Sequence, residues 1–437
     1  MNERQKAIEI FLTGVESVKP ENLLRRYISI DNNTLLIERL SFNLSEIRNI
    51  YIIGAGKASA AMAQTIESIL GSRITAGHII TKYNHSVPLK FIEITEAGHP
   101  VPDENGIRGT NNILSIAKRA EKEDLVICLI SGGGSALLAD LPEGCTLEDL
   151  KKVNNILLKT GANITEMNCI RKHLSTVKGG QLSRAAAPAR VVSLILSDVI
   201  GDPLDVIASG PTAADPTTFA QAISIIRKYK IENEIPGQIY RVLREGFEGK
   251  RKETVKDSDE VLLLTHNLVI GSNILALNEA KVKGESIGYD TRVITNNLAG
   301  DVSDVAKYIV ETAMGIKEEN KYKKICLLFG GEPTVKVKGK GSGGRNQHLA
   351  LITADLIKAL PGITILSGGT DGTDGPTDAA GAVVDSATLK KSLELHLNPD
   401  QYINNSDSYN FFRQTGGLII TGPTRTNVMD LIIVLID

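Results

Sequence analysis

The 437-residue sequence is poor in the residues that several common kinds of site require. It has no tryptophan, and aromatic residues make up 4% of the chain, which argues against a stacking surface for nucleotide bases or sugars. Its four cysteines form no C-x-x-C pair and its seven histidines form no H-E-x-x-H pattern, so a structural zinc site has no support. We expect buried, reduced thiols instead.

The sequence also lacks an excess of charge and long apolar runs. Its formal net charge is −2 and its pI is about 6.4, which argues against a nucleic-acid partner or an anionic membrane. Its longest apolar runs, such as 125–130 and 431–436, are far shorter than the roughly 20 residues of a membrane span. With no apolar core of a signal peptide near the start, we expect a soluble, cytoplasmic protein.

Glycine is abundant, with 40 copies, and its clusters follow short apolar runs. Because these runs are continuous rather than alternating, they predict strands covered on both faces. Apolar residues between 58 and 70 recur at helical spacing directly after one such cluster. Strand, glycine loop and helix in repetition predict a parallel α/β sheet, with the loops gathered at its carboxyl edge. The predicted strands are 51–53, 125–130, 191–196, 325–329 and 363–366.

The length predicts two to three domains of about 150 residues each. A charged, apolar-poor stretch at 248–260 precedes a predicted strand at 261–264, and we place the boundary there. The prediction is therefore an α/β fold of two α/β domains, 1–247 and 261–437. The first is a Rossmann-like doubly wound sheet, and the active site lies in the cleft between the domains.

Two glycine loops of the first domain predict anion sites. Gly54 and Gly56 open a G-x-G-x-x-G pattern, but Ser59 replaces the third glycine and Lys82 ends the next strand, where a dinucleotide fold expects an acid. Lys57 puts a cation at the start of a helix, where anions bind, although a tight turn with a solvated lysine fits too. The other loop offers a nest of backbone N–H groups, or else simple flexibility: Ser131, Gly132, Gly133, Gly134 and Ser135.

Acidic residues and one arginine complete the candidate site. Asp198 follows a predicted strand and suits a general base or a Mg²⁺ ligand, with a turn residue as the alternative. Asp371 or Asp374 could hold a metal ion, and a plain turn is as compatible. Arg345 lies beside glycines and suits a carboxylate or a phosphoryl group. His99, on a rigid turn, is read as structural. Together these groups favour phosphoryl transfer to a small molecule.

Taken as an ordered set, the motifs resemble those of the glycerate 2-kinase family, the class II glycerate kinases with a C-terminal MOFRL domain. They cover most of the chain from about residue 50 onward. One residue departs from the pattern, because Arg425 stands where a small residue is expected. The matching segments are 54–59, 96–103, 131–137, 197–203, 209–212, 330–334, 343–347, 369–375 and 421–428.

The resemblance implies ATP-dependent phosphorylation of D-glycerate at its 2-hydroxyl, with Mg²⁺ or another divalent cation. The products are 2-phosphoglycerate and ADP, in sugar-acid breakdown of the non-phosphorylated Entner–Doudoroff type. It also implies that Lys57 and Arg345 are active-site residues, and we expect Glu332 and Asn346 of the matching motifs to bind substrate or phosphate. The oligomeric state is left open, with a homodimer as one option.

Two other functions stay open at this point. Proteins of this family have been named hydroxypyruvate reductases, which would make this chain an NAD(P)H enzyme. Ser59 and the missing acid after the second strand argue against that reading. A non-catalytic sensor that binds a sugar acid would use Lys57 as a simple anion ligand and would not consume ATP.

Overall fold

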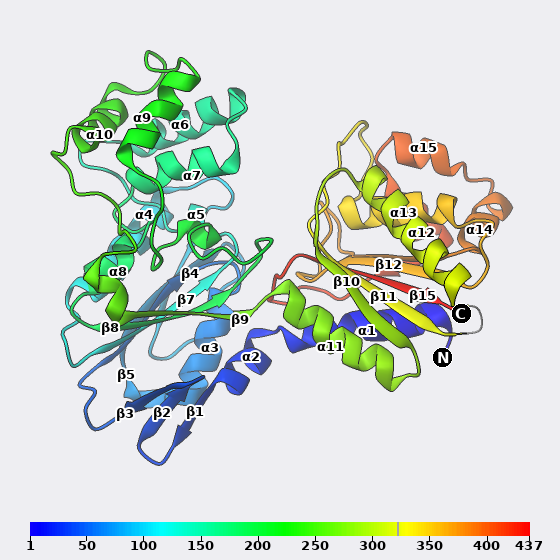
Figure 1. The fold of residues 1–437 in the computed structure, drawn as a ribbon, viewed down its shortest axis with the longest axis horizontal. Helices are drawn as coiled ribbons and strands as arrows, with labels where there is room; N and C mark the ends of the chain where they lie inside the picture. Colours follow the sequence, from blue (N-terminus) through cyan, green and yellow to red (C-terminus); the bar gives the residue numbers. More distant parts are fainter. Residues whose placement is uncertain (321–322) are drawn as a thin grey trace. The chain divides into compact units, whose positions relative to one another are not determined.

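The computed structural model describes residues 1–320 and 323–437, which form two compact units (Figure 1). The first unit is Leu23–Ile270, and the second is Met1–Asn22 together with Gly271–Asp437. Each unit contains a six-stranded sheet covered by helices. The predicted α/β class with two α/β domains is therefore confirmed.

The main sheet of the first unit has the strand order β6-β5-β4-β7-β8-β9. Numbered along the chain within this sheet, that is 3-2-1-4-5-6, the doubly wound order of dinucleotide-binding folds. The pairs from β6 to β8 are parallel, which confirms the Rossmann-like prediction. The strands are β4 (Ile50–Ala55), β5 (Ile74–Lys82), β6 (Glu93–Ala97), β7 (Leu125–Ser131), β8 (Arg190–Leu196) and β9 (Thr265–Gly271).

Helices and a small antiparallel sheet surround this main sheet. Helix α3 begins at Ser59, right after the first glycine loop, as the apolar spacing predicts. Four helices, α6, α7, α9 and α10, share a separate apolar cluster. The helices are α2 (Pro20–Tyr27), α3 (Ser59–Leu70), α4 (Glu104–Lys118), α5 (Gly134–Leu137), α6 (Leu147–Lys159), α7 (Ile164–His173), α8 (Gln181–Ala186), α9 (Phe219–Lys228) and α10 (Gly237–Phe247). The 3₁₀ turns are η1 (Gly71–Arg73), η2 (Ile207–Ser209) and η3 (Glu260–Leu264), and the small sheet is β1 (Ile28–Asp31), β2 (Thr34–Ile37) and β3 (Leu40–Asn43).

The sheet of the second unit is mixed, with the order β10-β11-β15-β12-β13-β14. The C-terminal strand β15 lies antiparallel between β11 and β12, and all seven of its residues are buried. Its strands are β10 (Asp290–Leu298), β11 (Ile325–Gly331), β12 (Ile363–Gly369), β13 (Gly381–Asp385), β14 (Leu418–Ile419) and β15 (Asp430–Ile436). Its helices are α1 (Glu3–Ser17), α11 (Asn273–Ser286), α12 (Val302–Glu319), α13 (Arg345–Leu356), α14 (Thr388–Glu394), α15 (Pro399–Asn404) and α16 (Ser408–Thr415).

The structure divides the chain at other residues than the predicted 1–247 and 261–437. The charged stretch 248–260 belongs to the first unit, because Val255 is fully buried there. Its N–H donates to the Gly179 carbonyl at 3.0 Å, and its carbonyl accepts from Asp215 N at 2.8 Å. The strand predicted at 261–264 is wrong: these residues form the 3₁₀ turn η3, and strand β9 begins only at Thr265.

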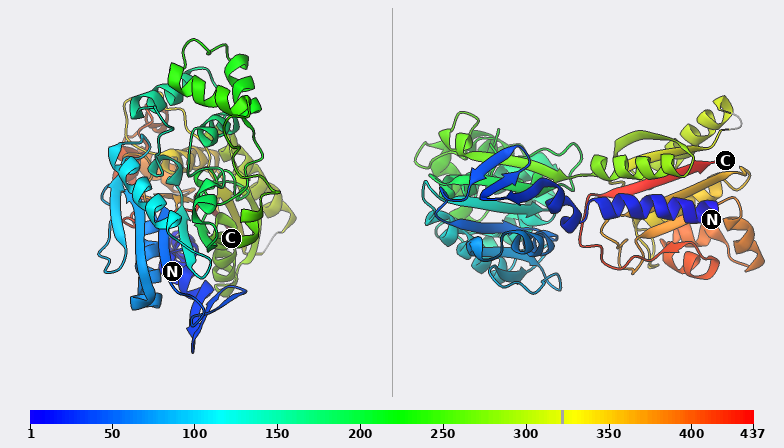
Figure 2. Two further views of the ribbon diagram at one scale, coloured as in Figure 1. Left: turned by 90° about the vertical axis from the view of Figure 1, so that its left-hand side faces the viewer. Right: turned by 90° about the horizontal axis from the view of Figure 1, so that it is seen from below.

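The first 22 residues belong to the second unit because helix α1 buries its apolar face there. Ile10 and Phe11 are fully buried, and α1 packs against α11, β12 and β15 (Figure 2). Arg4 adds a two-bond ion pair to Asp385, at 2.6 and 2.7 Å. The helix pattern alone does not reveal this partner, which lies near the other end of the chain.

Burial agrees with the remaining expectations from composition. Strands β7, β11 and β12 are buried along their whole length, as continuous apolar runs predict. All four cysteines are free and buried, and burial raises the pKa of Cys128 to about 12. Within residues 1–320 and 323–437, no helix combines the length and the apolar character that crossing a bilayer requires.

Candidate active site

The two predicted anion loops of the first unit lie side by side at the carboxyl edge of its sheet. The lysine loop (residues 54–57) follows β4, and the glycine loop (residues 131–135) follows the neighbouring strand β7. Lys57 N donates to the Gly132 carbonyl at 2.9 Å, and Ala58 N donates to Ser131 Oγ at 3.0 Å. Between β4 and β7 the strand order reverses, which is where doubly wound sheets bind their ligands.

Gly54 and Gly56 let these loops approach closely. A Cβ on Gly54 would lie 2.1 Å from the Leu129 carbonyl oxygen, and one on Gly56 would lie 2.0 Å from Ser131 Oγ. Both glycines have positive φ, of 156° and 148°. Any side chain at these positions would push the two loops apart, so we assign both glycines a packing role that places Lys57.

The glycine loop is covered by three of the polar side chains singled out from the sequence. A Cβ on Gly132 would lie 1.8 Å from the Asp198 carboxylate. One on Gly133 would lie 2.9 Å from the His99 ring and 3.3 Å from Lys57 Cε. The structure thus brings Lys57, Asp198 and His99 together around two adjacent glycines, although His99 was read as structural.

Lys57 places a cation at this loop, and Asp198 places an acid there. Burial, together with the charges of Lys57, Lys82 and His85, lowers the pKa of His99 to about 4. The imidazole is therefore neutral at pH 7, and Lys57 is the cation beside Gly133. A lysine beside backbone N–H groups and the start of α3 suits a phosphate group.

Backbone strain marks the far side of the glycine loop. Ser135 Oγ and Ser209 Oγ are 2.8 Å apart. Ala208, Ser209 and Gly210 have φ values of 51°, 61° and 59°, a left-handed run that non-glycine residues rarely adopt. Such strain often gathers at functional sites, and the Ser135–Ser209 contact places this segment beside the glycine loop.

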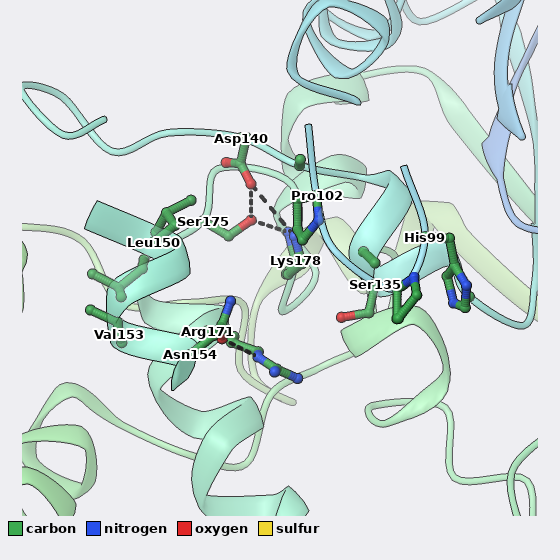
Figure 3. Close-up of a pocket in the computed structure, with 15 residues that line it drawn as sticks. His99, Pro102, Ser135, Asp140, Leu150, Val153, Asn154, Arg171, Ser175 and Lys178 are labelled. Carbon is green, nitrogen blue, oxygen red and sulfur yellow. Dashed lines mark hydrogen bonds and ion pairs between the residues drawn. The ribbon is translucent and has the colours of Figure 1, made fainter. Parts of the chain in front are cut away.

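A cavity of about 290 Å³ opens beside the glycine loop (Figure 3). Gly133, Ser135 and His99 line one part of it, and residues of α6, α7 and the following turn line the rest. Arg171 and Lys178 are the cations of this lining. Sequence analysis missed both residues, because neither lies in a glycine motif and only the folded packing brings them to the loop.

In the second unit, Arg345 is held by two carboxylates. It pairs with Asp430 through two bonds of 2.6 and 3.0 Å and with Glu332 at 2.8 Å. Burial would lower the pKa of Arg345, but Asp430 and Glu332 outweigh burial and raise it. Asp430 is fully buried, and its burial raises its own pKa. The predicted Glu332 therefore contacts Arg345 directly.

The predicted metal ligands Asp371 and Asp374 differ in environment. Asp374 is buried, and its two oxygens accept from Asn346 N at 3.0 Å and Gln347 N at 2.8 Å, which caps α13. Asn346 Oδ1 accepts from Ser367 Oγ at 2.6 Å, so this side chain too is engaged within the unit. Asp371 is partly exposed and accepts from Thr373 N at 3.1 Å.

These environments decide which predicted ligands fit a divalent cation. Among the described residues, no three His, Cys, Asp or Glu side chains are grouped as a metal site. Mg²⁺ in phosphate-handling sites needs only one or two carboxylates plus the substrate's phosphates. Asp371, which is partly exposed, fits that requirement, whereas Asp374 already uses both oxygens as a cap. The ligand set stays a prediction.

Comparison with known proteins gives matches over nearly the whole chain. Residues 6–244 match a domain of unknown function, DUF4147, and residues 325–430 match the MOFRL family. The chain is 40% identical to the D-glycerate 2-kinase of Thermotoga maritima over 437 residues, which covers 99% of this chain and 98% of that protein. The crystal structure of a glycerate kinase from Thermotoga maritima has a TM-score of 0.88 and 40% identity, covering 99% of each chain. A putative hydroxypyruvate reductase of Agrobacterium vitis is 40% identical over 389 residues, covering 88% of this chain and 86% of that one.

Proposed function

This chain belongs to the glycerate 2-kinase family, and we propose that it transfers the γ-phosphoryl group of ATP to the 2-hydroxyl of D-glycerate. The products are 2-phosphoglycerate and ADP. The observation that carries the proposal is Lys57, a cation beside a glycine loop at the strand-order reversal of a doubly wound sheet. A role in sugar-acid breakdown is part of the proposal and rests on the resemblance.

Phosphoryl transfer requires the protein to position the two substrates and to neutralise negative charge, and it does not require a covalent nucleophile. Backbone N–H groups of residues 131–135 and the start of α3 bind phosphate oxygens. Lys57 stabilises the negative charge that develops on the transferred group. Asp198, packed over Gly132, accepts the proton of the acceptor hydroxyl or holds the cation. A divalent cation would neutralise charge on the phosphates when bound.

The test is an incubation of the protein with ATP, Mg²⁺ and D-glycerate, followed by enolase alone. Enolase converts 2-phosphoglycerate directly, so phosphoenolpyruvate should form without phosphoglycerate mutase. L-Glycerate in place of the D-isomer is the control. A requirement for the mutase would show that the product is the 3-isomer, and no ADP release would remove the proposed activity.

The relative named as a putative hydroxypyruvate reductase supports a second candidate, hydride transfer from NAD(P)H. A ribose hydroxyl would need an acid at the end of the second strand of the sheet, and β5 ends at Lys82. We therefore expect no oxidation of NADH or NADPH with hydroxypyruvate in the absence of ATP. Lys82 could pair with the 2′-phosphate of NADPH, which NADH lacks. The assay with NADPH is therefore the more stringent of the two.

A further inference from the structure

The cavity beside the glycine loop carries a charge that the proposed phosphate chemistry does not use. Arg171, on α7, donates one hydrogen bond from Nε to Asn154 Oδ1 at 2.9 Å. Across the residues that the structure describes, it has no carboxylate partner. Arg171 is half-buried, and burial lowers its pKa. A guanidinium has five N–H donors, so most of its hydrogen-bonding capacity is open.

The other charges of the cavity cancel. Lys178 lies 3.6 Å from Asp140 and also donates to the Leu138 carbonyl. Asp140 in turn accepts from Ser175 Oγ at 2.7 Å. Figure 3 shows this network on one side of the cavity and the Arg171–Asn154 pair on another. The net charge of the lining is therefore about one positive unit, from Arg171, and a half-buried guanidinium with open N–H donors suits an anion.

The size and the walls of the cavity restrict that anion. Its volume of about 290 Å³ is near the low end of the roughly 300–1,000 Å³ of ligand pockets, which favours a small ligand. Leu150, Val153 and Leu174 form an apolar wall, while Ser135 and Ser175 supply hydroxyls. A small hydroxy-carboxylate matches a planar guanidinium, hydroxyl groups and a short apolar surface.

We propose that this cavity binds the acceptor substrate, and that Arg171 pairs with its carboxylate. The inference rests on the proposed kinase function, and it specifies the place in the first unit where the sugar acid binds. The cavity adjoins Gly133, and Lys57 Cε lies 3.3 Å from the position of a Cβ on that glycine. A hydroxy acid held by its carboxylate at Arg171 thus turns its hydroxyl toward Lys57 and the phosphate-binding loop.

The test compares Arg171→Met and Arg171→Lys with wild-type protein. Loss of a charge-assisted pair should raise the KM for D-glycerate by about 10- to 100-fold in Arg171→Met, with the KM for ATP unchanged. Arg171→Lys keeps the positive charge but lacks the planar guanidinium group. Its KM for D-glycerate should therefore lie between the values of wild-type protein and Arg171→Met. D-Glycerate alone should raise the Tm of wild-type protein but not that of Arg171→Met. Arg241→Met, an exposed arginine on α10, is the matched control.

Each outcome decides one proposal. If wild-type protein does not phosphorylate D-glycerate, the kinase proposal fails. If it does, and both Arg171 variants keep the wild-type KM and Tm shift, the cavity does not bind the acceptor. A rise in the KM for ATP alone would assign the cavity to the nucleotide and overturn the inference. Should Arg171→Met fail to fold by circular dichroism, Arg171→Lys decides by the same measurements.

Discussion

At the scale of single residues, Lys57 is the cation on which the proposed chemistry depends most. It lies beside the glycine loop, with Cε 3.3 Å from the position of a Cβ on Gly133. Removing a preorganised donor to developing charge typically costs about 10²–10³ in kcat. We expect that loss in Lys57→Ala, with an unchanged circular dichroism spectrum. Lys118→Ala, an exposed lysine on α4, should keep wild-type kcat, and a wild-type kcat in Lys57→Ala would falsify the role.

Asp198 has two open roles that one substitution separates. Asp198→Asn keeps the size and one acceptor oxygen but removes the charge, so kcat should fall. If Asp198 holds the cation, kcat should partly recover at high Mg²⁺, whereas a missing base is not replaced by metal. Asp202→Asn on the same loop is the control, since Asn tolerates its left-handed φ of 52°. Full activity of Asp198→Asn at ordinary Mg²⁺ would leave Asp198 a turn residue.

The raised pKa of Asp374 leads us to expect that the stability of the protein depends on pH. Burial raises the pKa of Asp374 to about 6, above its usual 3.8. The folded state then binds a proton more readily than the unfolded state, so this group's contribution to the free energy of unfolding falls as pH rises from about 4 to 6. Asp374→Asn has no titrating group at this position. The free energy of unfolding of this variant, relative to that of wild-type protein, should therefore increase by at most about 3 kcal/mol as pH rises over the same range. Urea unfolding at several pH values measures this, and a pH-independent difference would contradict it.

At the scale of elements, the contact between the glycine loop and the segment after β8 sets the position of Asp198. A Cβ on Gly132 would lie 1.8 Å from the Asp198 carboxylate, and the φ of Gly132 is not left-handed. Gly132→Ala should therefore keep the fold and displace the carboxylate. A displacement of about 1 Å can cost 10²-fold in kcat. Gly237→Ala on α10, where nothing lies within 4 Å, is the control. An unaffected kcat in Gly132→Ala would show that this contact does not matter for catalysis.

The elements also show what the sequence could predict. The buried strands, helix α3 and the position of the two glycine-rich loops after β4 and β7 were predicted correctly, because each depends on residues adjacent in the chain. The partners of Arg345, the cap on α13 and the cavity around Arg171 depend on contacts between distant segments. Asp430 lies 85 residues after Arg345, and Asp374 lies 27 residues after Gln347. Local patterns carry no information about such contacts, so those parts of the site required the structure.

At the scale of the whole molecule, the resemblance assigns one reaction to residues of both units, Lys57 in the first and Arg345 in the second. Arg345 also has a structural task, because it neutralises the buried Asp430. Removing one member of a buried pair typically costs about 3–5 kcal/mol, whereas removing both is often neutral. Lost activity in Arg345→Met alone would therefore not separate catalysis from folding.

The double variant Arg345→Met with Asp430→Asn makes that separation. We expect it to regain most of the stability lost in Arg345→Met, measured by urea unfolding, because no unpaired charge stays buried. Its kcat should stay low, since the cation proposed to act on the reaction is missing. Asp430→Asn alone keeps the arginine. Its kcat should therefore stay higher than that of Arg345→Met and that of the double variant. If the double variant regains both stability and kcat, Arg345 serves only as the partner of Asp430, and the groups needed for phosphoryl transfer lie within Leu23–Ile270.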